Sequence, residues 1–360
     1  MSSTCPFSNS SPVGVCPMKF DNKTDEKVGS RYKIDEHSKD SATIFPKCPF
    51  GYDSHTFKLG PLSCMLCRSL LYESSKCVPC SHKFCKTCIS RFKDCPLCGA
   101  DIEKIEPDND LQTTVDRFID GHARIKRSQL SSDFEEGGHE QKNVIYGDVS
   151  MERGAFLVQQ AMMAFHGKNI ESAKSRLEIC AQDIREQLQT QGNIPELCSQ
   201  LGAVLGMLGD CCRAMRNTEY AVKYYEESAE LLSMLPATDL ELVHTLSVSL
   251  NKVGDLKYYD GDLESARTYY TRALDVRRDA ISEKPNVSSQ IVDFAVSLAK
   301  VADVDRSLGN EDAAVKAFLE AIERLESLKL NSSEFVLEQR RLSVLQFLHN
   351  QIADNHSSSS

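Results

Sequence analysis

The residues of this chain most able to do chemistry are nine cysteine and histidine side chains within the 35 residues from Cys64 to Cys98. Eight of them follow the spacing Cys-x2-Cys, twelve residues, Cys-x-His-x2-Cys-x2-Cys, six residues, Cys-x2-Cys. Tetrahedral zinc takes four Cys or His ligands, and a Cys-x2-Cys turn delivers two thiolates to one metal ion. Eight ligands therefore suffice for two closed sites, in which zinc would be structural because no coordination position is left for water.

This ligand spacing resembles that of RING fingers of the three-Cys, one-His, four-Cys type. In that family the two sites interleave along the chain. The resemblance implies one zinc ion held by Cys64, Cys67, Cys85 and Cys88, and another held by Cys80, His82, Cys95 and Cys98. The ninth side chain, Cys77, is at Cys-x2-Cys spacing from Cys80 and could compete for a place. The family pattern favours His82 as the ligand and Cys77 as a buried thiol.

Most RING fingers are ubiquitin ligases, which bind a charged conjugating enzyme and orient it without covalent chemistry of their own. The family's contact positions correspond here to Leu66, Phe92 and Pro96, all apolar. Two features depart from the family. Phe92 stands where Trp is frequent, and Gly99 stands where a basic residue often contacts ubiquitin. Two interpretations stay open, a ligase and a zinc-stabilised interaction module.

The rest of the chain divides by composition and hydrophobic period. A helix is expected beside the zinc module because Leu111, Val115, Phe118 and Ile119 recur at helical spacing. The polar leader lacks a hydrophobic period and should be disordered. The expected segments are a leader at 1–47, the zinc module with its flanking helix at 48–127, a linker at 128–149, a helical array at 150–354 and a disordered tail at 355–360.

The helical array repeats four times. Each repeat has a small anchor residue, at Ala173, Ala221, Ala266 and Ala314. Sixteen and twelve residues before these anchors stand Leu157, Leu205, Leu250 and Leu298, then Ala161, Gly209, Gly254 and Ala302. Four and seven residues after them stand Leu177, Tyr225, Tyr270 and Phe318, then Cys180, Ser228, Ala273 and Ala321. Small residues let the two helices of a hairpin touch, and large ones fill the gap to the next hairpin.

This pattern resembles the tetratricopeptide repeat, which implies a mainly α fold, a solenoid of helical hairpins. The anchors are 48, 45 and 48 residues apart, against about 34 in the usual repeat. Second helices extended by two or three turns would explain the difference. A last helix, at about 334–354, is expected to cap the stack.

Stacked helical hairpins form a groove that binds peptides or protein surfaces. Asp210, Asp255 and Asp303 share one position in successive first helices, and Lys252 and Lys300 share another. Such a row has two interpretations. It is either a stripe that binds a partner protein or a set of ion pairs within the array.

Composition limits the partners. The chain is 41% hydrophobic and 26% charged, with a net charge of −10 and no run of eighteen apolar residues, so we expect no membrane span. Residues 128–360 hold 36 acidic against 23 basic side chains, which argues against nucleic acid as a main partner.

No secretory signal is visible, and a cytosolic location is expected. Reducing conditions there would favour metal thiolates over disulfides among the fifteen cysteines.

Three cysteines before the ligand cluster each precede a proline, namely Cys5 and Cys16 in the leader and Cys48 directly after it. A Cys-Pro pair holds its thiolate on a stiff turn and can ligate haem iron. Such pairs are also common by chance, so an ordinary loop cysteine is the alternative.

The order of these parts, with segments such as KCPFGYDSHTFKLGPLSCMLC and PELCSQLGAVLGMLGD, resembles a plant family of RING and tetratricopeptide-repeat proteins. Its members act as cytosolic, chaperone-like partners that keep catalase folded and active. The resemblance implies catalase as the client and a binding function without catalysis. The alternative is a ubiquitin ligase whose helical array selects the substrate, and a passive scaffold is a third class.

Overall fold

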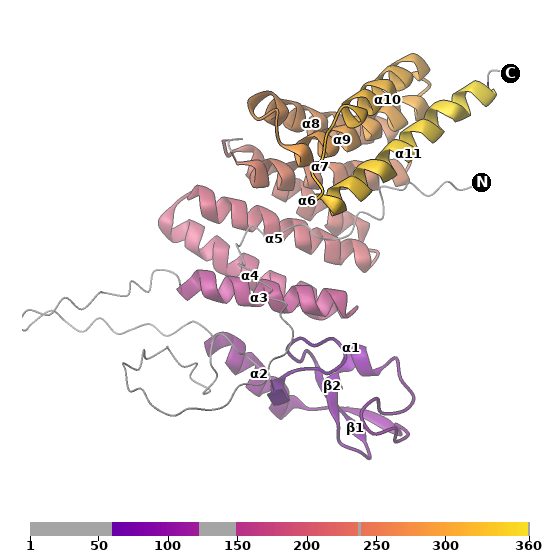
Figure 1. Cartoon of the computed structure of the whole chain (residues 1–360). Coiled ribbons are helices and arrows are strands. Elements are labelled where there is room, and N and C mark those ends of the chain that lie inside the picture. Colours follow the sequence, from indigo (N-terminus) through magenta and orange to yellow (C-terminus); the bar gives the residue numbers. More distant parts are fainter. Residues whose placement is uncertain (1–59, 122–148, 237–238, 359–360) are drawn as a thin grey trace, which may run out of the picture. The chain divides into compact units, whose positions relative to one another are not determined.

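The computed structural model describes residues 60–121, 149–236 and 239–358 (Figure 1). Within these ranges the chain is mainly α-helical, with one small sheet near the start. The residues form two compact units, and the boundary between them in the sequence falls between Asp183 and Ile184. The expected leader at 1–47 and most of the expected linker lie outside the described residues. Among the described helices, none combines the length and apolar character that a bilayer crossing requires.

The first unit begins with the cysteine-rich module. A short 3-10 helix, η2 (Gly60–Leu62), precedes three antiparallel strands in the order β2-β1-β3. β1 (Ser74–Val78) pairs with β2 (Lys83–Cys85) on one side and with β3 (Lys104–Pro107) on the other. α1 (Lys86–Ile89) follows β2 directly. This strand-to-helix junction holds Cys85 at the end of β2 and Cys88 within α1.

The flanking helix that the sequence predicts is α2 (Asn109–Gly121). Val115, Phe118 and Ile119 are buried along one side of it. Gln112 ties the helix to the sheet, because its side-chain Oε1 accepts hydrogen bonds from the backbone N–H of Ser74, at 2.9 Å, and from the Ser74 hydroxyl, at 3.0 Å. The module therefore contains a helix packed on its central strand.

The same unit contains the hairpin of α3 (Val149–His166) and the part of α4 (Ile170–Gln191) up to Asp183. The two helices run antiparallel. Arg153 on α3 forms an ion pair with Asp183 on α4 at 2.9 Å, and the Cys180 thiol lies 3.8 Å from the carbonyl of Gly154. The turn between the helices comprises Gly167, Lys168 and Asn169.

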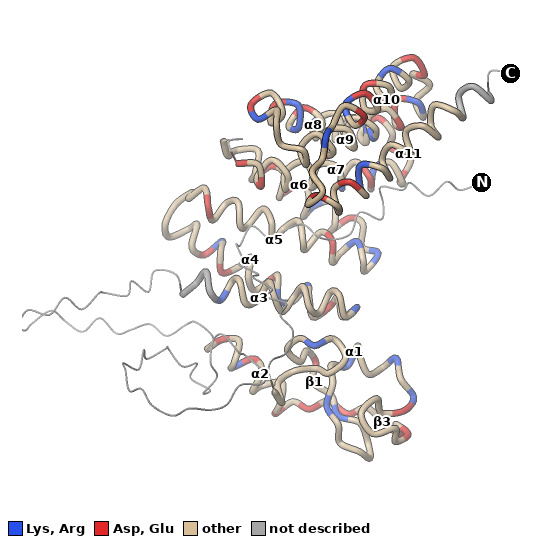
Figure 2. The backbone as a smooth tube through the Cα atoms, in the orientation of Figure 1, with Lys and Arg blue, Asp and Glu red and all other residues tan. Residues whose placement is uncertain are grey.

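The second unit is an array of helical hairpins. The pairs are α5 (Pro195–Ala214) with α6 (Thr218–Ser233), α7 (Leu240–Tyr259) with α8 (Leu263–Glu283), and α9 (Ser288–Ser307) with α10 (Glu311–Glu326). Each second helix also packs on the next first helix, and α11 (Phe335–Ser358) packs on α9 and α10 (Figure 1). α5 carries charge only at Glu196, Asp210 and Arg213, so it appears almost entirely tan in Figure 2.

The repeat positions deduced from the sequence form the hairpin contacts. All the residues of the four repeats named above are buried. At Gly209 the reason for the small residue is direct, because an added Cβ would lie 2.4 Å from the Tyr225 ring. At Gly254 the corresponding distance to the Tyr270 ring is 2.5 Å. A glycine on the first helix thus receives an aromatic ring from the second helix.

The extra length of each repeat lies in both helices of the hairpin. α5, α7 and α9 have 20 residues each, whereas α6 and α10 have 16. Among the second helices, α4, with 22 residues, and α8, with 21, are longer than these first helices. The long second helices α4 and α8 agree with the expectation of extended second helices, whereas α6 and α10 are shorter than the first helices. α11 also continues to Ser358, into the segment expected to be a disordered tail.

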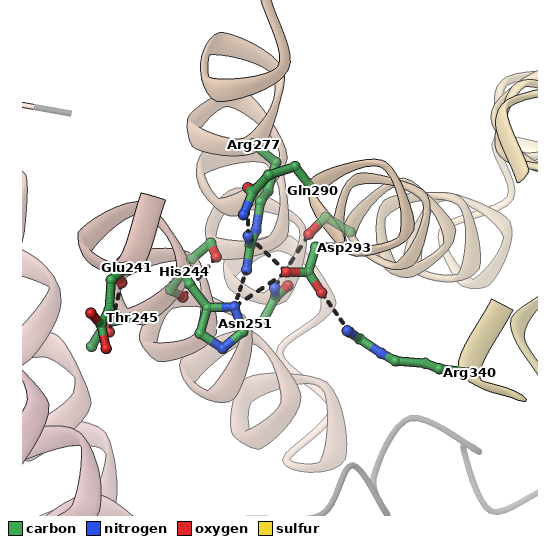
Figure 3. A network of polar contacts seen from close by, with 10 residues as sticks. Glu241, His244, Thr245, Asn251, Arg277, Gln290, Asp293 and Arg340 are labelled. Carbon is green, nitrogen blue, oxygen red and sulfur yellow. Dashed lines mark hydrogen bonds and ion pairs between the residues drawn. The ribbon is translucent and has the colours of Figure 1, made fainter. Parts of the chain in front are cut away.

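One buried carboxylate joins four helices of the array (Figure 3). Asp293 on α9 forms ion pairs with Arg277 on α8 at 2.9 Å and with Arg340 on α11 at 2.6 Å, and His244 on α7 lies 3.2 Å away. Asp293 and Arg277 are 5% and 2% exposed. Burial alone would raise the pKa of Asp293, but Arg277, His244 and Arg340 outweigh it and hold the pKa well below the usual range.

We expect Asp293→Asn to destabilise the folded protein by about 3 kcal/mol, because it leaves the Arg277 guanidinium buried without its counter-charge. Urea unfolding followed by circular dichroism measures the change. The matched control is Asp275→Asn, since Asp275 and its partner Arg278 are 54% and 53% exposed, and we expect about 1 kcal/mol or less. Equal effects of the two substitutions would contradict this account.

The lowered pKa fixes the pH range in which this difference appears. Asp293 contributes its stability fully above the pKa of an unfolded aspartate, about 3.9, and loses it as the pH falls through the lower folded-state pKa. The part of the difference between the wild-type protein and Asp293→Asn that comes from the Asp293 carboxylate should therefore shrink only as the pH falls below about 4.

Candidate metal centre

Four buried thiols form the first candidate site. The ligand atoms of Cys64, Cys67, Cys85 and Cys88 all lie within 4.8 Å of one another. Sγ of Cys67 and Sγ of Cys85 are 3.9 Å apart. A tetrahedral zinc ion with Zn–S bonds of about 2.3 Å places its sulfur ligands about 3.8 Å apart. The spacing of the four sulfur atoms therefore fits one tetrahedral metal ion.

The second candidate site contains three thiols and one imidazole. The ligand atoms of Cys80, His82, Cys95 and Cys98 also lie within 4.8 Å of one another. Nδ1 of His82 is the ring atom that faces the site, 3.5 Å from Sγ of Cys95. Tetrahedral zinc places a sulfur and an imidazole nitrogen about 3.6 Å apart. This site is more open than the first, because Cys98 is exposed and Cys80 and His82 are half-buried.

The backbone holds the first and the last Cys-x2-Cys turns by the same device. After the first turn, Arg68 adopts a positive φ of 57° and its N–H donates to the carbonyl of Cys64 at 2.8 Å. After the last turn, Gly99 has a φ of 71° and its N–H donates to the carbonyl of Cys95 at 2.7 Å. A glycine adopts this left-handed conformation without steric cost. Gly99 therefore has a structural role in closing the turn.

Hydrogen-bond donors converge on the sulfur atoms of the first site. The backbone N–H of Tyr72 lies 3.2 Å from Sγ of Cys85, and the side-chain amide of Asn169 lies 3.4 Å from Sγ of Cys88. Donors of this kind favour a thiolate over a thiol. Hydrogen bonds among the four thiols lower the pKa of Cys67 but raise the pKa of Cys85 and of Cys88. The surroundings thus fit anionic sulfur ligands of a metal ion.

Cys77 lies outside both groups. It is completely buried in β1. Burial raises its pKa to about 12, and the nearby Cys95 and Cys80 add to the increase. At neutral pH it is therefore a protonated thiol that packs in the interior of the module. This agrees with the prediction that Cys77 is a buried thiol and not a ligand.

The positions that contact a conjugating enzyme in ligases lie at the surface. Phe92 is 41% exposed, Pro96 is exposed and Leu66 is half-buried. Two neighbouring apolar side chains, Met65 and Leu97, are 62% and 47% exposed. All five apolar side chains are thus at least partly exposed within the first unit.

Comparison with known proteins decides the family. No protein-family model matches the chain. The chain is 67% identical over 320 residues to Protein NCA1 of Arabidopsis thaliana, a match that covers 89% of this chain and 79% of the relative. The chain belongs to the NCA1 family. A shorter match, 31% identical over 72 residues, links this NCA1 family member to the E3 ubiquitin-protein ligase CHFR of Danio rerio and covers 19% of this chain and 11% of the ligase.

Solved structures are similar only loosely to this NCA1 family member. BtubC (BKLC) from P. vanneervenii matches with a TM-score of 0.42 and 15% identity, over 62% of this chain and 76% of that one. A signal transduction ATPase with a tetratricopeptide repeat sensor, from Pyrococcus horikoshii, matches with a TM-score of 0.24 and 13% identity, over 69% and 41% of the two chains. The description of the fold depends on the helix contacts given above.

The charged row of the NCA1 family member lies between successive hairpins. Asp210 accepts hydrogen bonds from the Tyr225 hydroxyl at 2.8 Å and from Lys252 at 2.6 Å. Asp255 is held in the same way by Tyr270, at 2.7 Å, and by Lys300. These four aspartate and lysine side chains therefore form ion pairs within the array. This is the second interpretation of the charged row given in the sequence analysis.

Asp303, the third aspartate of the row, is only half-buried. Burial raises its pKa, although a hydrogen bond with Tyr258 and the charges of Arg306 and Lys300 act in the opposite direction. A role of the row in binding a partner remains a prediction. The haem candidates Cys5, Cys16 and Cys48 lie outside the described residues.

Sequence reasoning missed the polar residues through which the α3–α4 hairpin contacts the cysteine-rich module. The guanidinium of Arg176 donates to the carbonyl of Leu71 at 2.9 Å, and the side chain of Gln160 accepts from the N–H of Leu70 at 3.0 Å. Arg176 and Gln160 are 2% and 4% exposed. Buried polar groups need partners, but neither residue departs from an ordinary helix composition. Asn169 and Gly167, also missed, are considered below.

Elemental analysis of the purified protein should find two zinc ions per chain. Cys85→Ser should lower the zinc content by at least one ion per chain, because it removes a buried ligand and zinc binding contributes folding free energy. Cys77→Ala is the matched control and should retain both ions. A loss of zinc in Cys77→Ala, or fewer than two ions in the wild-type protein, would contradict the assignment.

Proposed function

We propose that this chain is a non-enzymatic, zinc-stabilised protein that binds catalase in the cytosol and maintains its folded, active state. The observation that carries the proposal is the 67% identity to Protein NCA1, which extends over 89% of this chain. Catalase enters through the resemblance to plant catalase partners described above. The match includes both the cysteine-rich module and the helical array, so the proposal concerns the whole chain.

The structure supports a binding function for both parts. Four protein ligands at each candidate site leave no position for a reactive water on tetrahedral zinc, which suits a structural metal. Helical repeats of this kind act by binding other proteins. A rigid module and an extended protein-binding surface both suit a chaperone-like partner.

A ubiquitin ligase is the second candidate, and the exposure of its expected contact positions favours it. Leu66, Phe92 and Pro96 are accessible where ligases contact conjugating enzymes, and the similarity to CHFR is to a ligase. Gly99 is the feature against it, since it provides no side chain to contact ubiquitin. We therefore place binding without catalysis first.

The main proposal predicts that catalase heated with an equimolar amount of this protein retains more activity and scatters less light than catalase heated alone. An unrelated protein at the same concentration is the control. Cys85→Ser should protect less than Cys77→Ala, because only the former removes a metal ligand. Stable binding with no protection would identify a passive scaffold and reject the proposal.

The two candidates differ in a second assay. With ubiquitin, its activating enzyme and a panel of conjugating enzymes, we expect the wild-type protein to form no ubiquitin conjugates, while an active RING ligase serves as positive control. Conjugates that appear with the wild-type protein and disappear with Phe92→Ala would establish the ligase instead.

A further inference from the structure

The turn between α3 and α4 lies directly against the first candidate metal site. The side chain of Asn169 is completely buried. Its Nδ2 is 3.4 Å from Sγ of Cys88 and 3.9 Å from Sγ of Cys67. Two of the four sulfur ligands therefore receive a donor from a residue that follows them by 81 and 102 positions in the chain.

Gly167, two residues earlier, lets the turn approach this closely. A Cβ added at Gly167 would lie 2.6 Å from both Cα and Cβ of Cys67. Any side chain at this position would have to displace the backbone of a metal ligand. The glycine is therefore needed for the close approach of two backbones.

Asn169 also has an ordinary role, which must be separated from its contact with sulfur. Its Oδ1 accepts from the N–H of Ser172 at 3.3 Å and so caps the N-terminus of α4. Asn217 caps α6 in the same way, at 3.4 Å from the N–H of Tyr220, and Asp262 caps α8, at 3.2 Å from the N–H of Ser265. Asp is therefore an adequate cap in this array.

The cap residues of these turns differ in the surroundings of their side chains. Asn217 is exposed, whereas Asn169 is buried against sulfur. The position of Gly167 is occupied in the other turns by Met215, Asp260 and Leu308, each of which has a side chain. Comparison of the four turns in the sequence shows the difference, but only the structure shows its cause.

We propose that Asn169 is a positioning residue for the first metal site. The cysteine-rich module supplies the four ligands of this site, and the α3–α4 hairpin completes its surroundings. The inference rests on the zinc part of the proposed function and is independent of catalase. Partners of this kind typically change metal affinity by about 10- to 100-fold. By thermodynamic reciprocity, a metal ion at the first site holds the hairpin in place as strongly as the hairpin holds the metal ion.

Asn169→Asp in the full-length protein tests the proposal. Asp keeps the cap oxygen but removes the N–H donor and places a carboxylate against the thiolates. Asn217→Asp is the matched control, since it makes the same chemical change at an exposed cap. Gly167→Ala disturbs the same site by pushing the turn away from the Cys67 backbone. Circular dichroism of this variant checks that its helices still form. Each protein is loaded with cadmium-113 and titrated with a chelator.

The two sites give separate cadmium resonances, because one has four sulfur ligands and the other has three sulfurs and a nitrogen. We expect Asn169→Asp and Gly167→Ala to lose the four-sulfur resonance at about 10- to 100-fold lower chelator concentration than the wild-type protein. The other resonance, and both resonances of Asn217→Asp, should be unchanged. Identical release from Asn169→Asp and Asn217→Asp, or equal weakening of both sites, would overturn the proposal. Wild-type protein without bound cadmium would reject the metal sites themselves.

Discussion

Charge compensation among clustered sulfur atoms is the constraint on which the first unit depends. Four thiol groups within 4.8 Å of one another cannot all ionise unless a cation lies between them, since like charges at this distance repel strongly. The donors from Tyr72 and Asn169 reduce this repulsion but do not remove it. A metal ion bound there would supply the missing charge, and its binding free energy would become folding free energy for the module.

The same physical problem, a buried charge that needs a partner, recurs in the array. Asp293 is held by Arg277 and Arg340, and Asp210 is held by Lys252. Replacing one member of such a pair is more damaging than removing both, because the remaining charge stays buried. The hairpins are thus fixed relative to their neighbours by specific ion pairs as well as by apolar packing. A fixed register suits a protein-binding surface that must present the same residues each time.

Much of this organisation could be predicted from local patterns. The ligand spacing from Cys64 to Cys98 predicts the Cys-x2-Cys pairs, and the resemblance to RING fingers predicts how they combine into the two groups. The period of small and large residues predicts the hairpins, although Tyr225, expected to fill the gap to the next hairpin, packs on Gly209 of its own hairpin. Patterns of this kind record contacts that recur at fixed spacing. The contact between Asn169 and Cys88 does not recur, and it joins residues 81 positions apart. In the sequence, Asn169 differs from the helix cap Asn217 by the glycine two positions before it, and only the folded arrangement shows the reason for that glycine and the second role of Asn169.

The most direct test of this account is hydrogen exchange, measured by mass spectrometry before and after a chelator removes the metal ions. The account predicts that peptides from 155–183 lose protection together with peptides from 64–98, while peptides from α7 to α10 keep theirs. Full protection of 155–183 in the metal-free protein would contradict the claim that the metal site and the α3–α4 hairpin stabilise each other.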